Sequence, residues 1–369
     1  MASKANRQPA FVLVGGFLGA GKTTLLRTAA EHLTKGGARV GLITNDQAAG
    51  LADTERLRAA GFEVSEIAGG CFCCRYPDLL AAADHLCEAV RPDVILAEAV
   101  GSCVDLVATV LRPLERIDSD LFVVAPFTVL IDPERLRELL SDRSPFPDEV
   151  AYIYRKQLEE ADILAINKSD LLDTEELAEL KTMAAAAFPG RTILGISAQC
   201  GEGVAPWLNR VRKERRTDRA TIEVDYDRYA TGEAALGWLN ASAQLTPSVV
   251  VDWREFVEGF VANLCRGLER ERGVIAHVKL FLTLPGASLA ASIVRDGQAP
   301  WLSGHASPSK AEAALVLNVR VGLPPKTLRA TVEHALAAAC GDTITLHVQR
   351  LDCFSPARPV PTHRLTEKA

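Results

Sequence analysis

The stretch Gly16-Phe-Leu-Gly-Ala-Gly21-Lys22-Thr23 restricts the fold more than any other part of the sequence. It follows the apolar run Phe11–Val14 and precedes a helical pattern, which is the setting that a phosphate-binding loop requires. Backbone N–H groups of such a loop surround the phosphates, its lysine reaches their β and γ oxygens, and the next hydroxyl binds Mg²⁺. The residues expected at the nucleotide are Gly16, Gly19, Ala20, Gly21, Lys22, Thr23 and Thr24, with Lys22 catalytic and Thr23 a Mg²⁺ ligand.

Short apolar runs alternate with helical patterns up to about residue 213. The expected strands are Phe11–Val14, Val40–Thr44, Phe62–Ile67, Val94–Ala97, Leu121–Val124, Ile163–Ile166 and Thr192–Ile196. Apolar strands separated by helices predict an α/β fold, a mainly parallel sheet of the P-loop nucleoside triphosphatase type with helices on both faces. Ligands of such sheets bind beyond the carboxyl ends of the strands, so polar residues at those ends are candidate site residues.

The pattern changes after the charged stretch 210–219. The elements expected beyond it are a strand near Thr221–Tyr226, a helix over Trp253–Leu268, strands near 274–284, 290–294 and 314–321, a helix from Pro324, and a strand over Ile344–Val348. These elements predict a smaller α+β domain with a split βαβ arrangement over residues 214–369, after a nucleotide-binding domain over residues 9–213. The Pro-rich end is expected to be an extended tail.

The composition argues against two classes of protein, those that span a membrane and those that bind nucleic acid. The 369 residues are 48% hydrophobic and 24% charged, and none of their apolar runs approaches the length of a membrane helix. A net charge of −6 gives no basic face for nucleic acid, and the basic stretch 210–219 is interpreted as a solvated helix end. The apolar run after Arg7 leads into the phosphate loop and not into a signal-peptide cleavage site. We therefore expect a cytoplasmic protein that binds neither nucleic acid nor membrane.

The stretch Asn167-Lys168-Ser169-Asp170 selects the base. A carboxylate at Asp170 accepts hydrogen bonds from N1–H and N2–H₂ of guanine, which adenine does not offer, and the stem of Lys168 covers the ring face. The alternative is a helix N-cap at Ser169 or Asp170. Together with the phosphate loop, the motif favours GTP. The residues expected at the base are Asn167, Lys168 and Asp170, with Ser197 and Ala198 in a second loop after the next strand.

Two carboxylates follow expected strands. Glu98 is placed to orient Mg²⁺ through water, or to respond to the γ-phosphate through the N–H of Gly101, and a structural ion pair is its alternative. Asp46 begins a loop that could order on the γ-phosphate, and here the functional and structural interpretations weigh equally. Both are candidate catalytic residues. Gln47 could position the attacking water, although an exposed loop amide is the favoured interpretation.

The second strong motif is Gly69-Gly70-Cys71-Phe72-Cys73-Cys74. Three thiols within four residues, after a flexible turn, are expected to converge on one point. Thiolates favour Zn²⁺ and other soft ions, and a tetrahedral site needs one further ligand: water, a partner's side chain, or Cys103. Redox-inert cysteines are the alternative, and for Cys103 alone a small buried residue is favoured. Nine cysteines, an odd number, argue against a disulfide framework.

Taken in order, these motifs resemble the CobW-like family of P-loop GTPases: the loop at 15–24, Cys-x-Cys-Cys at 71–74, Glu-x-x-Gly at 98–101 and Asn-Lys-x-Asp at 167–170. The resemblance covers about residues 9–213. It implies slow GTP hydrolysis coupled to binding and delivery of a transition metal, usually Zn²⁺ or Co²⁺, to a client protein, and often a nucleotide-dependent homodimer. The C-terminal half lacks the Arg-x-Lys-Gly signature and the histidine-rich tract of many family members.

The expected function is therefore that of a GTP-hydrolysing metallochaperone that uses Mg²⁺ and carries Zn²⁺ or Co²⁺ on the cysteine loop. One alternative is a GTP-dependent chaperone that gates loading of an organic cofactor, such as a corrinoid, into a client enzyme without carrying metal. Another is a small-molecule kinase, but the sequence has no evident phosphoacceptor base or Arg-rich lid.

Overall fold

The computed structural model describes residues 8–215 and 220–366, and the chain forms two compact units. The first takes in the chain up to Gln47, Leu57–Tyr229, and the end of the chain from Arg358. The second takes in Ala48–Arg56 and Ala230–Ala357. The chain therefore leaves the first unit for a short segment after its second strand and then returns. The last residues of the basic stretch, 216–219, lie outside the described residues.

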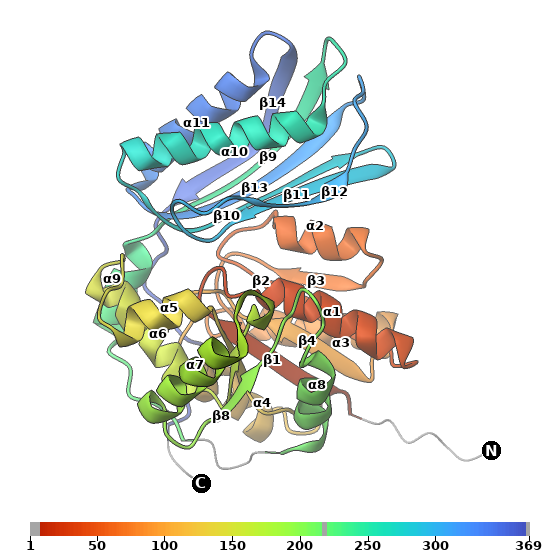
Figure 1. The fold of residues 1–369 in the computed structure, drawn as a ribbon. Helices are drawn as coiled ribbons and strands as arrows, with labels where there is room; N and C mark the ends of the chain where they lie inside the picture. Colours follow the sequence, from red (N-terminus) through yellow and green to blue (C-terminus); the bar gives the residue numbers. More distant parts are fainter. Residues whose placement is uncertain (1–7, 216–219, 367–369) are drawn as a thin grey trace, which may run out of the picture. The chain divides into compact units, whose positions relative to one another are not determined.

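A parallel β-sheet forms the centre of the first unit (Figure 1). Its order within the described residues is β3-β2-β4-β1-β6-β7-β8, and β5 pairs with β1. Every pair of strands is parallel. The strands are β1 (Ala10–Gly16), β2 (Val40–Asn45), β3 (Val64–Ile67), β4 (Val94–Glu98), β5 (Val123–Val124), β6 (Thr128–Ile131), β7 (Ile163–Ile166) and β8 (Thr192–Gly195). The predicted α/β fold class is confirmed.

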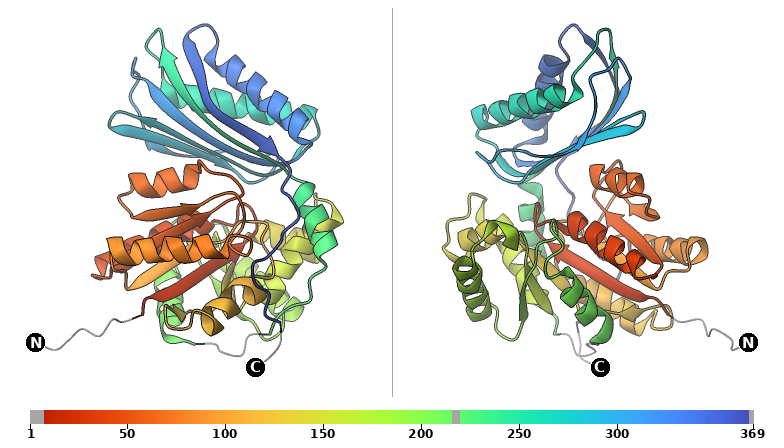
Figure 2. Two further views of the ribbon diagram at one scale, coloured as in Figure 1. Left: turned by 180° about the vertical axis from the view of Figure 1, so that it is seen from behind. Right: turned by 45° about the vertical axis from the view of Figure 1, so that its right-hand side comes forward.

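Helices flank this sheet (Figure 2). Those within the first unit are α1 (Lys22–Lys35), α3 (Tyr76–Ala89), the π-helix η1 (Val107–Leu111), α4 (Arg112–Arg116), α5 (Pro133–Leu140), α6 (Asp148–Glu160), the 3-10 helix η2 (Ser169–Leu171), α7 (Thr174–Ala187) and α8 (Val204–Lys213). Two further helices, α2 (Ala52–Ala59) and α9 (Tyr226–Ala234), are divided between the two units. Val12 and Val14 of β1 pack in one core with α1 and α8. Phe11, which points to the opposite face because side chains alternate along a strand, stacks on Phe122. Both faces of β1 are therefore buried, as its apolar sequence predicts.

The second unit is an antiparallel sheet with two long helices on one face (Figure 1). Its strand order is β12-β11-β10-β13-β9-β14. The elements are β9 (Gly237–Pro247), α10 (Trp253–Arg270), β10 (Val274–Leu284), β11 (Ala287–Ile293), β12 (Trp301–His305), β13 (Ala313–Gly322), α11 (Pro325–Cys340) and β14 (Ile344–Phe354). Because β9 and β10 both pair antiparallel with β13, they run parallel to each other and α10 crosses between them. This is the predicted split βαβ arrangement.

Several expectations about individual elements were wrong. The stretch 221–225 contains no strand, and α9 begins at Tyr226. Alternating apolar residues make a strand only where a sheet edge accepts their backbone groups, and this stretch has no ladder partner among the described residues. The sequence interpretation also missed β6, β9 and β12. As expected, the Pro-rich end after β14 contains neither helix nor strand within the described residues.

Among the described residues, none of the helices combines the length and the apolar character needed to cross a membrane.

Candidate nucleotide and thiol site

The phosphate loop lies between the end of β1 and the start of α1. Gly21 caps the helix with a φ of 97°, and a Cβ at this position would lie 2.3 Å from Nδ2 of Asn167, so only glycine fits. The Lys22 Nζ donates hydrogen bonds to the carbonyl oxygens of Gly16 (2.7 Å) and Phe17 (3.3 Å). The amine is thus folded over the loop itself, where phosphate oxygens are expected to replace these carbonyls as acceptors. The other expected loop residues, Gly19, Ala20, Thr23 and Thr24, lie in the same turn and the first turn of α1.

Thr23 contacts the carboxylate at the end of the neighbouring strand. Its Oγ1 donates to Glu98 Oε2 at 2.9 Å and lies 3.2 Å from Oε1. The two residues meet because β1 and β4 pair in register with Val14 opposite Glu98. Both side chains are buried. The hydroxyl and the carboxylate together offer the hard oxygen ligands that Mg²⁺ prefers, so these residues fit the ion that the motif predicts.

Asn167 ties the predicted base-binding loops to the phosphate loop. Its Nδ2 donates to the carbonyl oxygen of Ala20 at 2.8 Å, and its Oδ1 accepts from the N–H of Ala198 at 2.9 Å. The side chain is buried, whereas Asp170, three residues later, is exposed. Asn167 therefore positions the loops, and the carboxylate of Asp170 is accessible to a ligand.

The other predicted base contacts have defined partners. Lys168 has a left-handed backbone conformation with a φ of 59°, and its Nζ donates to Asp132 Oδ2 at 2.5 Å. Ser197 is buried, and its Oγ accepts from the N–H of Cys200 at 3.0 Å. Sequence reasoning missed Asp132 because it missed β6, which this residue follows. A carboxylate directly after a buried strand was the signal that could have found it.

The two residues at the end of β2 have different roles. Asp46 is buried, and its N–H donates to the carbonyl oxygen of Ile67 at 3.1 Å. Asn45 was not a candidate, yet it organises the thiol loop: its Nδ2 donates to Ile67 O (3.1 Å) and Gly70 O (2.8 Å), and its Oδ1 accepts from Phe72 N (3.0 Å). A polar residue ending an otherwise buried strand was the available signal. The segment after Gln47 belongs to the second unit.

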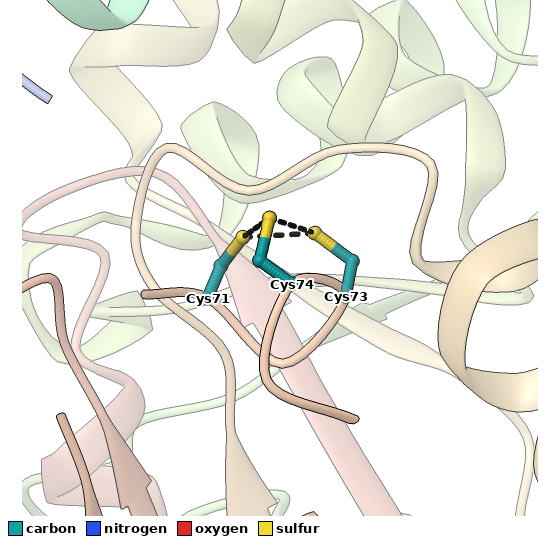
Figure 3. A group of neighbouring side chains, drawn as sticks. All are labelled: Cys71, Cys73 and Cys74. Carbon is teal, nitrogen blue, oxygen red and sulfur yellow. Dashed lines mark hydrogen bonds between the residues drawn. The ribbon is translucent and has the colours of Figure 1, made fainter. Parts of the chain in front are cut away.

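The predicted convergence of the thiols is confirmed (Figure 3). The Sγ atoms of Cys71, Cys73 and Cys74 all lie within 4.8 Å of one another. Cys74 is 3.5 Å from Cys71 and 3.7 Å from Cys73, and the Cys71–Cys73 pair is closer at 2.8 Å. With Zn–S bonds of about 2.3 Å, tetrahedral geometry separates sulfur atoms by about 3.8 Å. The three thiols therefore fit a soft metal ion after the closest pair opens by about 1 Å.

Cys103 joins this cluster from the turn after β4. Its Sγ lies 4.0 Å from Cys73 Sγ, and both side chains are buried. The turn is fixed by Gln157 of α6, whose Nε2 donates to the carbonyl oxygens of Gly101 (2.9 Å) and Cys103 (3.0 Å). Gln157 carried no signal in the sequence, because its role depends on where α6 packs. The turn that begins at Glu98 thus ends beside the sulfur cluster.

Crowding keeps these thiols protonated. Hydrogen bonding with Cys103 and burial raise the pKa of Cys71, and the same neighbour raises the pKa of Cys73 well above its usual value. The hydrogen bond with Cys71 raises the pKa of Cys74 to about 11, while the N–H of Val360 acts in the opposite direction. A metal ion must therefore displace protons to bind here, as is general for thiolate sites.

The fold and the loop at the end of β1 define the class: this is a P-loop nucleotide-binding protein that also carries a thiol cluster on the segments that follow β3 and β4. Residues 10–194 match the family model described as CobW/HypB/UreG, nucleotide-binding domain. The chain belongs to this family, as its motifs predict.

Three curated relatives are similar to parts of the chain. The zinc chaperone CobW of Sinorhizobium sp is 27% identical over 262 residues, covering 62% of this chain and 73% of the relative. The zinc chaperone CobW of Pseudomonas aeruginosa is 29% identical, covering 53% and 58%. The zinc-regulated GTPase metalloprotein activator 1 of Schizosaccharomyces pombe is 30% identical, covering 46% and 41%. The chain thus spans between about two fifths and three quarters of these proteins.

Solved structures are similar at a lower level. The Zn(II)-bound YjiA GTPase from E. coli is 18% identical, covers 89% of this chain and 99% of its own, and gives a TM-score of 0.39. HypB from Helicobacter pylori in complex with nickel is also 18% identical, covers 58% and 92%, and gives 0.40. Similarity at this level does not specify the ligands of the present chain.

Proposed function

We propose that the protein is a GTP-hydrolysing metallochaperone, in which the nucleotide state controls the binding and delivery of a transition metal, with Zn²⁺ favoured over Co²⁺. The observation that carries this proposal is that one short turn connects the phosphate loop's neighbouring carboxylate to the thiol cluster. Residues Glu98–Cys103 begin at a carboxylate that contacts Thr23 and end at a sulfur atom 4.0 Å from Cys73. Relatives named as zinc chaperones support zinc as the cargo, and one named as a metalloprotein activator supports a client metalloprotein.

The phosphates of GTP occupy the loop between β1 and α1. Lys22 turns from its two backbone acceptors to the β- and γ-phosphate oxygens and stabilises the charge that develops during hydrolysis. Thr23 and Glu98 would hold Mg²⁺, directly or through water, and the ion would supply positive charge to the phosphate oxygens. Asp46, directly after β2, would order its loop in response to the γ-phosphate.

The exposed carboxylate of Asp170 selects guanine by accepting hydrogen bonds from N1–H and N2–H₂. Replacing Asp170 with Asn substitutes a donor for one of these acceptors. We expect Asp170→Asn to weaken GTP binding and to strengthen binding of xanthosine triphosphate, which has a carbonyl where guanine has its amino group. Titration of both nucleotides checks this, and a parallel loss of affinity for both would contradict the assignment.

The metal site consists of four thiolates: Cys71, Cys73 and Cys74 from the loop after β3, and Cys103 from the turn after β4. Four sulfur ligands favour Zn²⁺ over hard ions such as Mg²⁺. Because Cys103 comes from a different segment, a shift of the turn changes the tetrahedron without unfolding the cysteine loop. A γ-phosphate that draws Gly101 toward the phosphate loop therefore moves one of the four ligands.

Coupling of this kind is reciprocal. If GTP tightens zinc binding, zinc tightens GTP binding by the same factor. Hydrolysis removes the γ-phosphate, relaxes the turn at Gly101, and lowers the affinity for the metal, which passes to the client. Asn45 adds a second connection, because it joins the strand that precedes Asp46 to the backbone of the cysteine loop.

Metal analysis of protein purified with a non-hydrolysable GTP analogue tests the proposal. We expect about one zinc ion per chain in the unmodified protein, and none in the triple variant Cys71→Ser, Cys73→Ser, Cys74→Ser, which should still bind GTP. Cys200→Ser is the matched control, because this cysteine is exposed and outside the cluster. Protein that contains no stoichiometric metal in the GTP-bound form would overturn the proposal and favour the cofactor-loading alternative.

A further inference from the structure

The end of the chain returns to the thiol cluster. We call the residues Arg358–Thr366 the C-terminal strap. They belong to the first unit, and the left view of Figure 2 shows the segment after β14 running across that unit without forming a helix or strand. Both ends of the strap are held: Arg358 pairs with Asp227, and Arg364 Nε donates to the buried Asp105 Oδ2 at 2.6 Å.

The middle of the strap lies on the cysteine loop itself. The N–H of Val360 donates to the Sγ of Cys74 at 3.2 Å, and the N–H of Thr362 donates to the carbonyl oxygen of Cys73 at 2.8 Å. The Thr362 hydroxyl lies 3.4 Å from the carbonyl oxygen of Cys74. Beyond these contacts, the ring of His363 stands edge-on to Tyr76 at 5.0 Å between centroids. Two of these contacts come from backbone N–H groups of the strap, and two come from its side chains.

Cys74 is the ligand at which such a donor matters most. The thiols of Cys71, Cys73 and Cys103 are buried, whereas Cys74 is partly exposed. A partly exposed thiolate is the position at which water or a client ligand reaches the metal first. The strap covers this position and gives the sulfur a hydrogen bond of the charge-assisted kind once a metal has displaced its proton.

We propose that the C-terminal strap is part of the metal site, with the N–H of Val360 as a positioning group that holds the Cys74 sulfur in its ligating orientation. This inference rests on the proposed function, because it requires metal at the four thiols. Groups that hydrogen-bond to metal ligands typically contribute a factor of about 10 to 100 to metal affinity. The strap thereby sets how tightly the cargo is held, and transfer to a client requires that it lift from Cys74.

The sequence around Val360 allows the N–H to be removed alone. Pro359 and Pro361 flank this residue, and a following proline already biases the backbone of Val360 toward the extended conformation that proline itself adopts. The side chain of Val360 is 72% exposed, so its loss costs little packing. Val360→Pro therefore deletes the donor, and Val360→Ala is the matched control that keeps it.

The test measures zinc affinity by competition with a chelator in the full-length chain. We expect Val360→Pro to raise the dissociation constant at least about tenfold relative to Val360→Ala, with equal thermal unfolding of the two metal-free variants. With Co²⁺ in place of zinc, the sulfur-to-metal charge-transfer band should shift in Val360→Pro only, because it reports the electron density on the ligating sulfur.

Combining each variant with Cys74→Ser completes a double-mutant cycle, and the difference between Val360→Pro and Val360→Ala should disappear in that background. Equal zinc affinity of the two Val360 variants in the otherwise unmodified chain would overturn the inference while leaving the proposed function intact. Absence of zinc binding by the unmodified protein would instead overturn the proposed function, and the role of the strap with it.

Discussion

Two segments leave the same edge of the parallel sheet and end in different surroundings. The turn after β4, residues Glu98–Cys103, stays in the first unit and reaches the sulfur cluster. The segment after β2, residues Ala48–Arg56, belongs to the second unit. The turn after β4 begins at Glu98, which contacts Thr23 at the start of α1, whereas β2 lies one strand further from β1 in the sheet. Only the first ends at the proposed metal site.

The way each segment is held differs as well. In the second unit, Asn318 Oδ1 accepts from the N–H of Ala52 at 2.8 Å and its Nδ2 donates to Gly50 O at 3.0 Å. Asn240 Nδ2 donates to Ala48 O at 3.2 Å, and Lys279 forms an ion pair with Asp53. Buried amides thus fix the backbone of this segment to the antiparallel sheet.

The turn after β4 is held by Gln157, whose Nε2 donates to the carbonyl oxygens of Gly101 and Cys103, and it ends at a sulfur atom that a metal would hold. In the proposed mechanism, the γ-phosphate therefore acts on the metal through the turn after β4. The segment Ala48–Arg56 is instead fixed to the antiparallel sheet of the second unit. The predictions below separate the two, from the largest effect to the smallest.

The largest effect is expected from a substitution in the phosphate loop itself. Lys22→Ala should lower GTP hydrolysis by at least about 100-fold, because the amine is the proposed stabiliser of the transition-state charge on the phosphates. The dependence of zinc affinity on the bound nucleotide should disappear with it. Phosphate release under saturating GTP is the measurement, and Lys35→Ala, at the exposed end of the same helix, is the control. Hydrolysis at the rate of the control would remove Lys22 from the mechanism.

The next substitution changes only the turn after β4. Cys103→Ser should weaken zinc binding by a factor of about 10 to 100, because one of four thiolates is lost, and it should leave GTP affinity without zinc unchanged. Chelator competition gives the affinity, with Cys200→Ser as control. If Cys103→Ser binds zinc as tightly as the control, the fourth ligand is another group and the turn after β4 is not the connection to the metal.

A third substitution loosens only the segment Ala48–Arg56. Asn318→Ala removes a buried amide that satisfies two backbone groups, and it should lower the free energy of unfolding by about 1 to 3 kcal/mol. Zinc affinity in the GDP-bound state should not change. Urea denaturation checks the stability, with Asn209→Ala on the exposed side of α8 for comparison. A change in GDP-state zinc affinity would show that the two segments are not separate.

The smallest effect concerns Glu160, a buried residue that binds the backbone shortly after the turn that follows β4. Glu160 Oε2 accepts from the N–H of Val107 at 3.1 Å, and burial raises the pKa of Glu160 well above its usual value. A carboxyl group with a raised pKa contributes stability that is complete below its unfolded-state pKa and is lost as the pH rises toward the folded-state value.

We therefore expect the unmodified protein to lose stability relative to Glu160→Gln as the pH rises from 5 to 8. Urea midpoints of both proteins at the two pH values provide the measurement. Parallel pH profiles for the two proteins would mean that Glu160 ionises normally.

Much of the site could be predicted because it is local. The phosphate loop and the cysteine loop each lie within ten residues, and their geometry follows from glycine turns and strand ends. The meeting of Thr23 and Glu98 also follows from a general rule, since carboxyl ends of neighbouring parallel strands lie at one edge. The family, the fold class and the convergence of three thiols were confirmed on that basis.

The rest depends on contacts between distant residues. Asn45 holds the cysteine loop, Gln157 holds the turn after β4, and Val360 reaches Cys74 from 286 residues away. For Asn45 the available signal is its place at the end of a buried strand, whereas Gln157 and Val360 have no residue type or spacing that marks their roles. The same holds for the segment Ala48–Arg56, whose place in the second unit depends on buried amides of another sheet. Local patterns predict elements, but not which distant backbone group a side chain satisfies.

The most direct test of the account is the zinc dissociation constant of the unmodified protein, measured by chelator competition with GDP and with a non-hydrolysable GTP analogue. The account predicts tighter binding with the analogue, by a factor of about 5 to 150 for a typical coupling free energy, and an equal tightening of the analogue by zinc. The same dissociation constant with both nucleotides would contradict it.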